Sequence, residues 1–465
     1  MNGLVKDRSF YKTFFKLTLT IALQNVIVHS VNLADNVMLG RFNENAMAGV
    51  ALVNQLQFLL QCMVMGLAEA ALMFSSRSWG EKDIPAIRKI TNISVKCGFI
   101  LSFCLFAAAL IFPEFILSLL SSNPLEIEEG VRYLRIICFS YPMFAVSQLL
   151  LFMLRSVETV RIGVVTSVTT LVINVCLNYV FIYGNLGFPS MGVRGAAIAT
   201  LTSRTVELLI VCYYVFFRDR KVELRLKHFG RIDRELFFMY VKKGLPVFLS
   251  SVMWGFAQGV QTSILGHTEG PTIKANSISS VVFQIVTVIT YASASATGVV
   301  IGKAIGEGKT DLVRPYAKTL QLLYLGIGLV TGTAFYLLKG PIISFYNISP
   351  EAKTVADQFM TVLSVTVIGT SYQMPCHTGI VRAGGDTSFI LKVDTIFMWL
   401  VIIPISSIAS FVFGAPPVIV YICLKCDQVL KCVIAAIKVN SFNYIKSLKA
   451  GGKASVNEET AGVEE

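Results

Sequence analysis

The chain has 465 residues, of which 54% are hydrophobic and 15% are charged, and its formal net charge is +12. Soluble globular proteins carry roughly 25% charged residues, so the composition excludes an ordinary water-soluble domain and indicates a protein whose solvent is the lipid bilayer. The positive charge does not indicate nucleic-acid binding, because no basic soluble domain is predicted to carry it.

A helix that spans the bilayer needs about 20 predominantly apolar residues, and runs of that length recur along the whole chain. We predict twelve spanning helices. Their approximate ranges are 14–39, 48–74, 91–112, 131–154, 160–183, 193–217, 240–265, 277–301, 319–338, 355–381, 390–413 and 416–437. The first run follows several basic residues, but it is too long for a cleaved signal peptide and is predicted to remain as the first span.

Basic residues predict how these helices are oriented. With the N-terminus inside, most of the 40 Lys and Arg residues fall in cytoplasmic segments, and nine of them crowd into residues 218–243. Cytoplasmic loops carry such an excess, so we expect a multi-pass protein of the cell membrane with both termini cytoplasmic and in contact with anionic lipid. Residues 218–239 interleave charged and apolar residues, which predicts a short amphipathic helix.

The two halves of the chain repeat each other. Residues 35–40 (DNVMLG) align with 261–266 (QTSILG) at an offset of 226, and residues 77–81 (RSWGE) align with 303–307 (KAIGE) at the same offset. The repeated glycines are expected to serve loop geometry. Because each half holds six spans, the two repeats have the same orientation in the membrane.

The predicted fold is therefore an all-α integral membrane protein with twelve transmembrane helices in two pseudo-symmetric six-helix bundles. The predicted parts are an N-terminal lobe over 1–217, a cytoplasmic linker over 218–239, a C-terminal lobe over 240–440 and a disordered tail over 441–465.

Four segments of the chain carry a resemblance to a known family. They are LADNVMLGRF, GLPVFLSSVMWGFAQGVQTSILG, IGKAIGEGKTDLVRPYA and GIVRAGGDTSFILKVDTIFMWLVIIP. They resemble the multidrug and toxic compound extrusion (MATE) transporters, and the resemblance extends over about residues 10–440. It implies a two-lobe antiporter that exports organic compounds in exchange for sodium ions or protons, with Asp35, Asn174 and Asn178 at the ion site.

Asp35 is also the leading candidate from the residues alone, because a charge within the hydrocarbon costs several kcal/mol. It lies in the outer third of the first span, beside a polar stripe. That stripe consists of Asn25, His29, Asn32 and Asn36, and helix five offers a matching stripe of Ser167, Thr170, Asn174 and Asn178. Polar stripes are unstable against lipid, so we expect them to face each other inside the N-terminal lobe.

Such a site suits a small cation. A carboxylate flanked by amide oxygens can hold Na⁺, with Asp35 and Asn174 as the expected ligands, and a desolvated carboxylate can instead carry a proton. A structural hydrogen-bond network is the alternative interpretation. One branch of the resembled family has Asp in place of Asn178, and this departure weakens the inference that protons rather than sodium drive transport.

A substrate cleft is predicted from polar and aromatic residues of both lobes. The candidates are Asn54, Gln57 and Gln61 in helix two, and Trp254, Gln258, Gln261, Asn276, Gln284, Tyr372 and Gln373 in the C-terminal lobe. Gln261 stands at the repeat position of Asp35. An aromatic ring beside amides suits cationic amphipathic compounds, whereas simple packing is the alternative role. Another branch of the family has a Glu where Trp254 stands and an acid near Ser371, so coupling through those two positions is not expected here.

Two further charged pairs are expected to be local, Asp394 with Lys392, for which a gate is the alternative, and Arg204 with Glu207, unless these two pair with other neighbours. Glu69 in helix two has no partner that the sequence reveals. No catalytic or ATPase motif is found. We therefore expect a monomeric antiporter of small organic molecules that is not an enzyme and needs no cofactor besides the coupling ion. The alternative is a flippase for a lipid-linked saccharide of the same superfamily, which would need a large cationic cleft.

Overall fold

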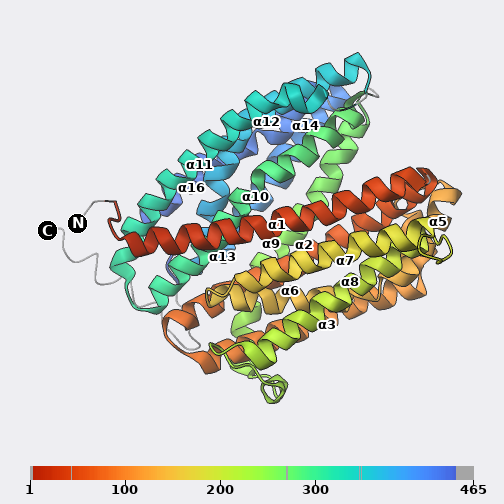
Figure 1. Cartoon of the computed structure of the whole chain (residues 1–465). Helices are drawn as coiled ribbons and strands as arrows, with labels where there is room; N and C mark the ends of the chain where they lie inside the picture. Colours follow the sequence, from red (N-terminus) through yellow and green to blue (C-terminus); the bar gives the residue numbers. More distant parts are fainter. Residues whose placement is uncertain (1–3, 43, 269–270, 345, 347, 447–465) are drawn as a thin grey trace. The chain divides into compact units, whose positions relative to one another are not determined.

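The computed structural model of the protein describes residues 4–42, 44–268, 271–344, 346 and 348–446, with only the backbone described at 32, 36, 41, 42, 44 and 45. All regular structure in these ranges is helical (Figure 1). The elements are α1 (Arg8–Phe42), α2 (Glu44–Gly80), α3 (Ile84–Ile111), α4 (Pro113–Ser118), α5 (Pro124–Ile137), α6 (Ser140–Ser156), α7 (Arg161–Tyr183), α8 (Val193–Tyr213), η1 (Tyr214–Arg218), η2 (Leu226–Phe229), α9 (Arg234–Gly266), α10 (Pro271–Gly306), α11 (Thr310–Ser344), α12 (Pro350–Met374), η3 (Pro375–Val381), α13 (Thr387–Thr395), η4 (Ile396–Ile402), α14 (Ile403–Ser407), η5 (Ile408–Val412), α15 (Pro417–Lys425) and α16 (Asp427–Ser441).

Each predicted span coincides with a helical stretch. Among the described residues, nine helices are long and apolar enough to cross a bilayer, and α5 with α6, which meet at a bend of 54°, make a tenth span. The two further predicted spans are helical but irregular. The helix α12 begins with a polar segment that contains Glu351 and Asp357, and the last span is broken into α15 and α16 at Cys426.

The chain divides into two compact units, each with its own core. The N-terminal unit comprises Thr20–Ser75 and Ile84–Asp233, and the C-terminal unit comprises Met1–Leu19, Ser76–Asp83 and Arg234–Glu465. The first turns of α1 and the last turn of α2 thus pack with the C-terminal unit, although they belong to the first half of the sequence. The start of α1 is held there by Phe10, whose ring centroid lies 4.4 Å from that of Tyr316.

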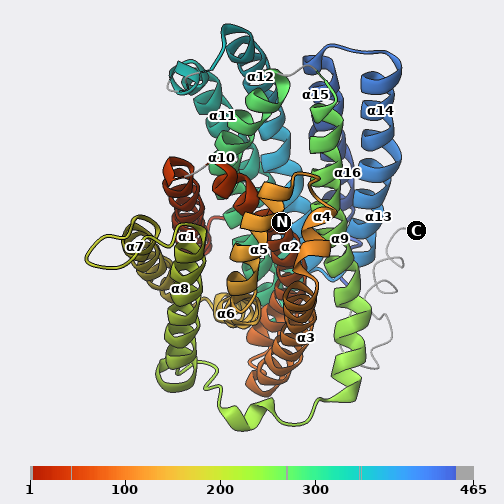
Figure 2. The ribbon, with the colours of Figure 1, turned by 90° about the vertical axis from the view of Figure 1, so that its right-hand side faces the viewer.

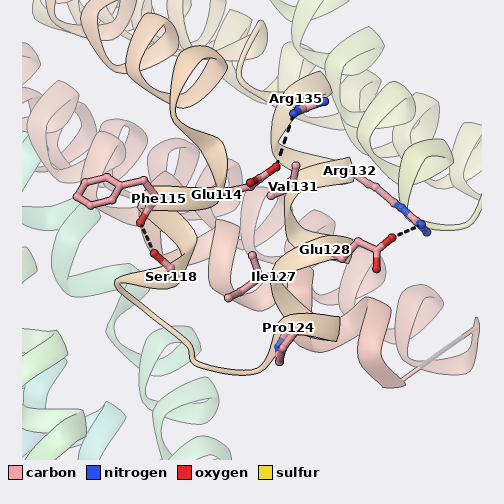
Figure 3. A pocket seen from close by; sticks show the side chains of 9 residues that line it. All are labelled: Glu114, Phe115, Ser118, Pro124, Ile127, Glu128, Val131, Arg132 and Arg135. Atoms are coloured by element: carbon pink, nitrogen blue, oxygen red, sulfur yellow. Dashed lines mark hydrogen bonds and ion pairs between the residues drawn. The ribbon is translucent and has the colours of Figure 1, made fainter.

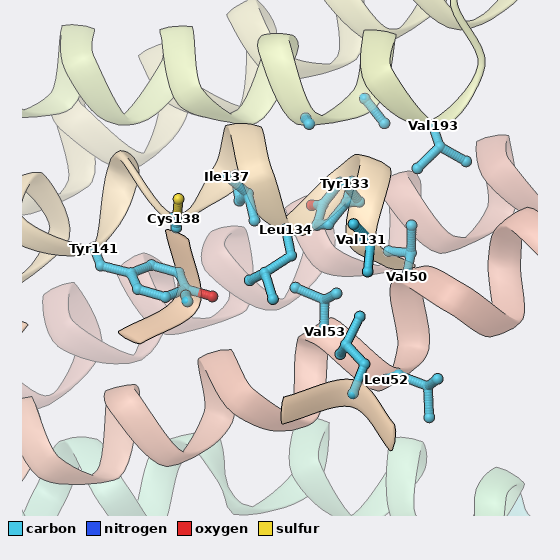
Figure 4. Packing of buried hydrophobic residues seen from close by; sticks show 14 of the residues in the cluster. Val50, Leu52, Val53, Val131, Tyr133, Leu134, Ile137, Cys138, Tyr141 and Val193 are labelled. Carbon is cyan, nitrogen blue, oxygen red and sulfur yellow. The ribbon is translucent and has the colours of Figure 1, made fainter. Parts of the chain in front are cut away.

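The core of the N-terminal unit lies where α2, α5, α6 and α8 converge. Figure 4 shows Val53 of α2 facing Leu134 and Ile137 of α5, and all three side chains are completely buried. The helices α7 and α8 run side by side in this unit (Figure 1). The residues that α7 buries are mainly polar and include Ser167, Thr170, Asn174 and Asn178. This helix therefore directs its polar face into the unit and positions the site described below.

The C-terminal unit is built on α9 to α16, with α11 and α12 side by side (Figure 2). Its core includes Phe359 and Tyr421, whose rings stack at 3.9 Å with an interplanar angle of 5°. Its helices contain three π-helical stretches, η3 in the tenth span and η4 and η5 in the eleventh. The irregular backbone of this unit thus lies in two neighbouring spans. Short π-helical insertions are frequent at functional sites.

The prediction of an amphipathic helix in the central loop is wrong. Between Asp219 and Asp233 the structure contains only the short 3₁₀ turn η2. The loop is held by side chains instead, since Arg88 of α3 donates to the carbonyl of Val222 at 2.7 Å and Lys96 donates to the carbonyl of Gly230 at 2.5 Å. Basic side chains of α3 satisfy backbone groups that a helix would have satisfied internally.

The repeated glycine motifs meet backbone to backbone within the C-terminal unit. A Cβ atom on Gly306 would lie 2.0 Å from the carbonyl oxygen of Arg77, and a Cβ atom on Gly80 would lie 2.2 Å from that of Lys303. The buried guanidinium of Arg77 also donates to the carbonyl of Ala383 at 3.2 Å. Small residues let helices approach this closely, so Gly80 and Gly306 serve helix contact rather than the expected loop geometry.

This contact predicts opposite outcomes for one substitution at two glycines. Gly306→Ala should lower the free energy of unfolding by about 1–3 kcal/mol, because its methyl group would collide with the backbone at Arg77. Gly326→Ala in α11 is the matched control, since nothing lies within 4 Å of its Cβ position, and it should be neutral or slightly stabilising. Thermal unfolding of both variants in detergent measures the difference, and equal stabilities would contradict the close contact.

Candidate functional site

A buried polar chain links three helices of the N-terminal unit. The side-chain amide of Asn178 in α7 donates to Oδ1 of Asp35 in α1 and, at 3.1 Å, to Oδ1 of Asn174. Asn174 in turn donates to the hydroxyl of Thr200 in α8 at 3.2 Å. Asn174 and Asn178 are completely buried, and Asp35 is partly buried. The spacing of four residues places both asparagines on the same face of α7, so the predicted pairing of Asp35 with this face is what the structure contains.

No basic side chain neutralises this carboxylate. Asp35 has no ion pair within the described residues, and its hydrogen-bonded neighbours are neutral amides. The nearby guanidinium of Arg204 is engaged with Glu207 at 2.6 Å, as expected from the sequence, and Glu207 also accepts a hydrogen bond from Gln148 at 3.1 Å. A carboxylate in a helical membrane bundle without a counter-charge is an electrostatic site for a small cation.

An unsatisfied oxygen lies in the same place. Oδ1 of Asn178 is buried and accepts no hydrogen bond in the described structure. Buried amide oxygens are almost always paired, so an orphaned acceptor beside a carboxylate is a position where a cation or a proton donor fits. Sodium takes hard oxygen ligands of this kind, and a protonated carboxyl group could donate to the amide oxygen after the amide flips.

The polar residues predicted in the first two spans lie apart from this chain of hydrogen bonds. The side chain of Asn32 is outside the described residues. Asn54 and Gln57 of α2 are half-buried, Gln61 is exposed, and none of them bonds to Asp35. The hydrogen bond between Asn174 and Thr200 was not predicted from the sequence. A single threonine in an apolar helix does not indicate which side chain it will contact.

The predicted cleft residues of the C-terminal unit fall into separate groups. Tyr372 donates to Gln321 at 2.7 Å, and Gln373 donates to Gln428 at 3.0 Å. Gln261 is buried and donates to the sulfur of Met398 at 3.1 Å. The remaining four lie elsewhere on α9 and α10: Gln258 and Asn276 are half-buried, and Trp254 and Gln284 are exposed.

A charged network in the same unit was not predicted from the sequence. Lys431 of α16 lies 3.2 Å from the carboxylate of Asp394 and 3.4 Å from that of Asp427, and Ser250 of α9 donates to Asp394. The expected pairing of Asp394 with Lys392 is therefore wrong. The helix α13 directs Asp394 towards α9 and α16, whereas Lys392 is exposed. Asp394 and Lys431 are 37 positions apart in the sequence, so their pairing becomes visible only in the packed structure.

A hollow on the surface of the N-terminal unit contains none of these residues. It lies between α4 and α5 and is bordered by Glu114, Ile127 and Arg135 (Figure 3). Arg135 approaches Glu114 at 3.9 Å, and both side chains are largely exposed. Among the described residues no three His, Cys, Asp or Glu side chains gather as transition-metal ligands would.

Duplicated bundles of long apolar helices, with an uncompensated carboxylate held inside one of them, define a polytopic membrane protein of the transporter class. The model of the MatE family, that of the MATE transporters, matches residues 20–180 and again residues 246–408. The two matches begin 226 residues apart, which is the offset of the internal repeat. The chain therefore belongs to the MATE family, and the predicted all-α fold with twelve helices in two bundles is that of this family.

Relatives and solved structures agree with this assignment over most of the chain. It is 21% identical over 412 residues to the uncharacterized transporter YisQ of Bacillus subtilis, covering 88% of each chain. It is 24% identical over 407 residues to the probable multidrug resistance protein NorM of Thermotoga maritima, covering 85% of this chain and 84% of that one. A crystal structure of a mutant of the Vibrio cholerae MATE transporter VcmN superposes with a TM-score of 0.85 at 16% identity, covering 95% and 98% of the two chains.

The charged network of the C-terminal unit generates a stability prediction. Lys431→Met should lower the free energy of unfolding by about 3 kcal/mol or more, because it leaves Asp427, whose side chain is only 2% exposed, without its counter-charge. Lys392→Met is the matched control and should change stability by less than about 0.5 kcal/mol, because Lys392 is exposed. Adding Asp427→Asn to Lys431→Met should recover part of the loss. Thermal unfolding in detergent tests all three variants, and a larger effect at Lys392 would contradict the network.

Proposed function

We propose that this protein is a secondary active antiporter that exports organic compounds in exchange for Na⁺ or H⁺ by alternating access. The observation that carries the proposal is Asp35, a partly buried carboxylate with neutral amide partners and no basic neighbour within ion-pair distance in the described structure. The names of relatives support export of drugs, since NorM of Thermotoga maritima is a probable multidrug resistance protein and MdtK of Photorhabdus laumondii is a multidrug resistance protein.

The coupling follows from the electrostatics of the site. An unpaired carboxylate inside the membrane is costly, so binding of a cation or a proton neutralises Asp35 and favours the conformational change that carries the occupied site to the other side of the membrane. Release on the other side restores the charge. An ion gradient then drives export if ion and compound favour different conformations of the protein.

The candidate ligands fit either ion. Oδ1 of Asn178 and Oδ1 of Asn174 are oxygens that could join the Asp35 carboxylate around Na⁺. The same carboxylate could bind a proton instead. Sodium and pH gradients imposed separately across proteoliposomes distinguish the two, because only the coupling ion drives uptake of dye into inverted vesicles.

The proposal extends to the surroundings of the transporter. We propose a monomer in the cell membrane with both termini cytoplasmic, with lobes over 1–217 and 240–440 joined by the linker 218–239. The exposed Trp254 and the amides near it suit amphipathic compounds that carry a positive charge. The flippase alternative is not favoured, because the relatives whose names state a role are multidrug resistance proteins or probable ones.

Asp35→Asn tests the proposal directly. The amide keeps the size of the side chain and can still bond to Asn178, but it cannot take a proton or supply a charge to Na⁺, so ion-driven export of a fluorescent dye should fall to background. The measurement is dye transport in proteoliposomes under an imposed ion gradient, with equal amounts of inserted protein.

The control variant for this test is Asp311→Asn. Asp311 is an exposed carboxylate in the first turn of α11, and its neutralisation should leave transport unchanged. Full ion-driven transport by a correctly inserted Asp35→Asn variant would refute the assigned role of the carboxylate.

A further inference from the structure

The two halves of the chain carry opposite chemistry at corresponding positions. Gln261 stands 226 residues after Asp35, so the carboxylate of the first repeat becomes a neutral amide in the second. In the N-terminal unit the third helix of the site offers the hydroxyl of Thr200. In the C-terminal unit the corresponding helix offers Lys425, 225 residues later, whose ammonium donates to Oε1 of Gln261 at 3.4 Å.

Lys425 is half-buried and makes no ion pair within the described residues. Its contacts in the described structure are Gln261 and the ring of Tyr421, whose centroid lies 5.8 Å from the ammonium nitrogen. The carboxylate next to it in the chain, Asp427, is committed to Lys431 and to the side-chain amide of Gln428. Asp394 is likewise committed to Lys431 and Ser250. Lys431 therefore makes two ion pairs, whereas Lys425 makes none in the described structure.

Lys425 lies within the last predicted span, nine residues after Pro416, which precedes the first residue of α15. At ~1.5 Å per residue this is about 13 Å along the helix, in a span expected to cross about 30 Å of hydrocarbon. A lysine within a span requires a polar partner inside the protein.

The backbone is irregular around this ammonium group. The regular α-helix of the last span is interrupted for one residue, Cys426, immediately after Lys425, where α15 ends and α16 begins with the backbone of Cys426 still in helical dihedral angles. Met398, the partner of Gln261, lies within the π-helical stretch η4. Local irregularities of this kind are frequent at functional sites.

The geometry points to an anion-binding site at Lys425 that receives a carboxylate of the exported compound. The site lies in the C-terminal unit and is formed by Lys425, Gln261 and the ring of Tyr421. The ammonium group would bind the carboxylate, and the Gln261 amide would donate to its second oxygen. This inference rests on the proposed export function and narrows its substrates to amphipathic compounds with an acidic group, zwitterions among them.

A pair of dyes separates this site from general apolar binding. One dye is a xanthene with a free carboxylate, and the other is its methyl ester, which has the same aromatic body without the negative charge. The full-length protein in detergent should bind the acid at least roughly ten times more tightly than the ester, since hydrogen bonds to charged groups are the strong ones. Fluorescence anisotropy gives both dissociation constants without any ion gradient.

Variants of Lys425 assign the preference to this side chain. Lys425→Met should remove the preference for the acid and leave ester binding within about two-fold, whereas Lys425→Arg should retain it because the charge remains. Lys392→Met, at an exposed lysine of the same unit, should change neither constant. If Lys425→Met does not fold, the two dyes are compared on the wild-type protein and on Lys425→Arg. Equal binding of acid and ester by both would contradict the anion site.

Two results would overturn the assignment. The first is equal binding of acid and ester by the wild-type protein, or binding of neither. The second is a preference for the acid that survives in Lys425→Met, which would mean that another group holds the carboxylate. The outcome is independent of ion coupling, because Asp35→Asn should keep the preference in binding even though it loses driven transport.

Discussion

The N-terminal unit depends on one constraint, that the carboxylate of Asp35 is held inside a helical bundle without an ion pair in the described structure. The hydrogen bond from Asn178 fixes its position, and Asn174 and Thr200 extend the contact to α8. Amide donors stabilise the carboxylate without neutralising it. A salt bridge at this place would have closed the site to external cations, and the available guanidinium of Arg204 is bound to Glu207 instead.

In the C-terminal unit the carboxylates inside the helical bundle are partly compensated by ion pairs. Its two carboxylates Asp394 and Asp427 share the ammonium of Lys431, a cation that the chain itself supplies. One unit of negative charge is left over among these three side chains, but each carboxylate has an ion-pair partner, whereas Asp35 has none in the described structure. This difference supports the proposal that ion coupling depends on the N-terminal unit, and Lys425 is the proposed anion site of the C-terminal unit. Duplication kept the helical plan while the polar residues diverged.

Much of the fold was predictable because lipid imposes strong and local rules. Each span must be about 20 apolar residues long, and its backbone must bond within the helix, so the composition of each segment decides its structure without knowledge of its neighbours. The same rules predicted Asp35, since an acid in an apolar run is conspicuous, and the spacing of Asn174 and Asn178 placed both on one helix face. The loop after α8 was predicted wrongly, because there the backbone bonds to side chains of α3.

By itself the sequence determined the membrane class, the duplication, the order of the helices and the face on which Asp35 meets α7. Only the tertiary structure decided which charges pair: Lys431 rather than Lys392 with Asp394, and no acid with Lys425. The reason is physical. Helix formation and membrane insertion depend on residues a few positions apart, whereas electrostatic pairing depends on distances of about 3–4 Å between side chains that packing alone brings together from distant parts of the chain.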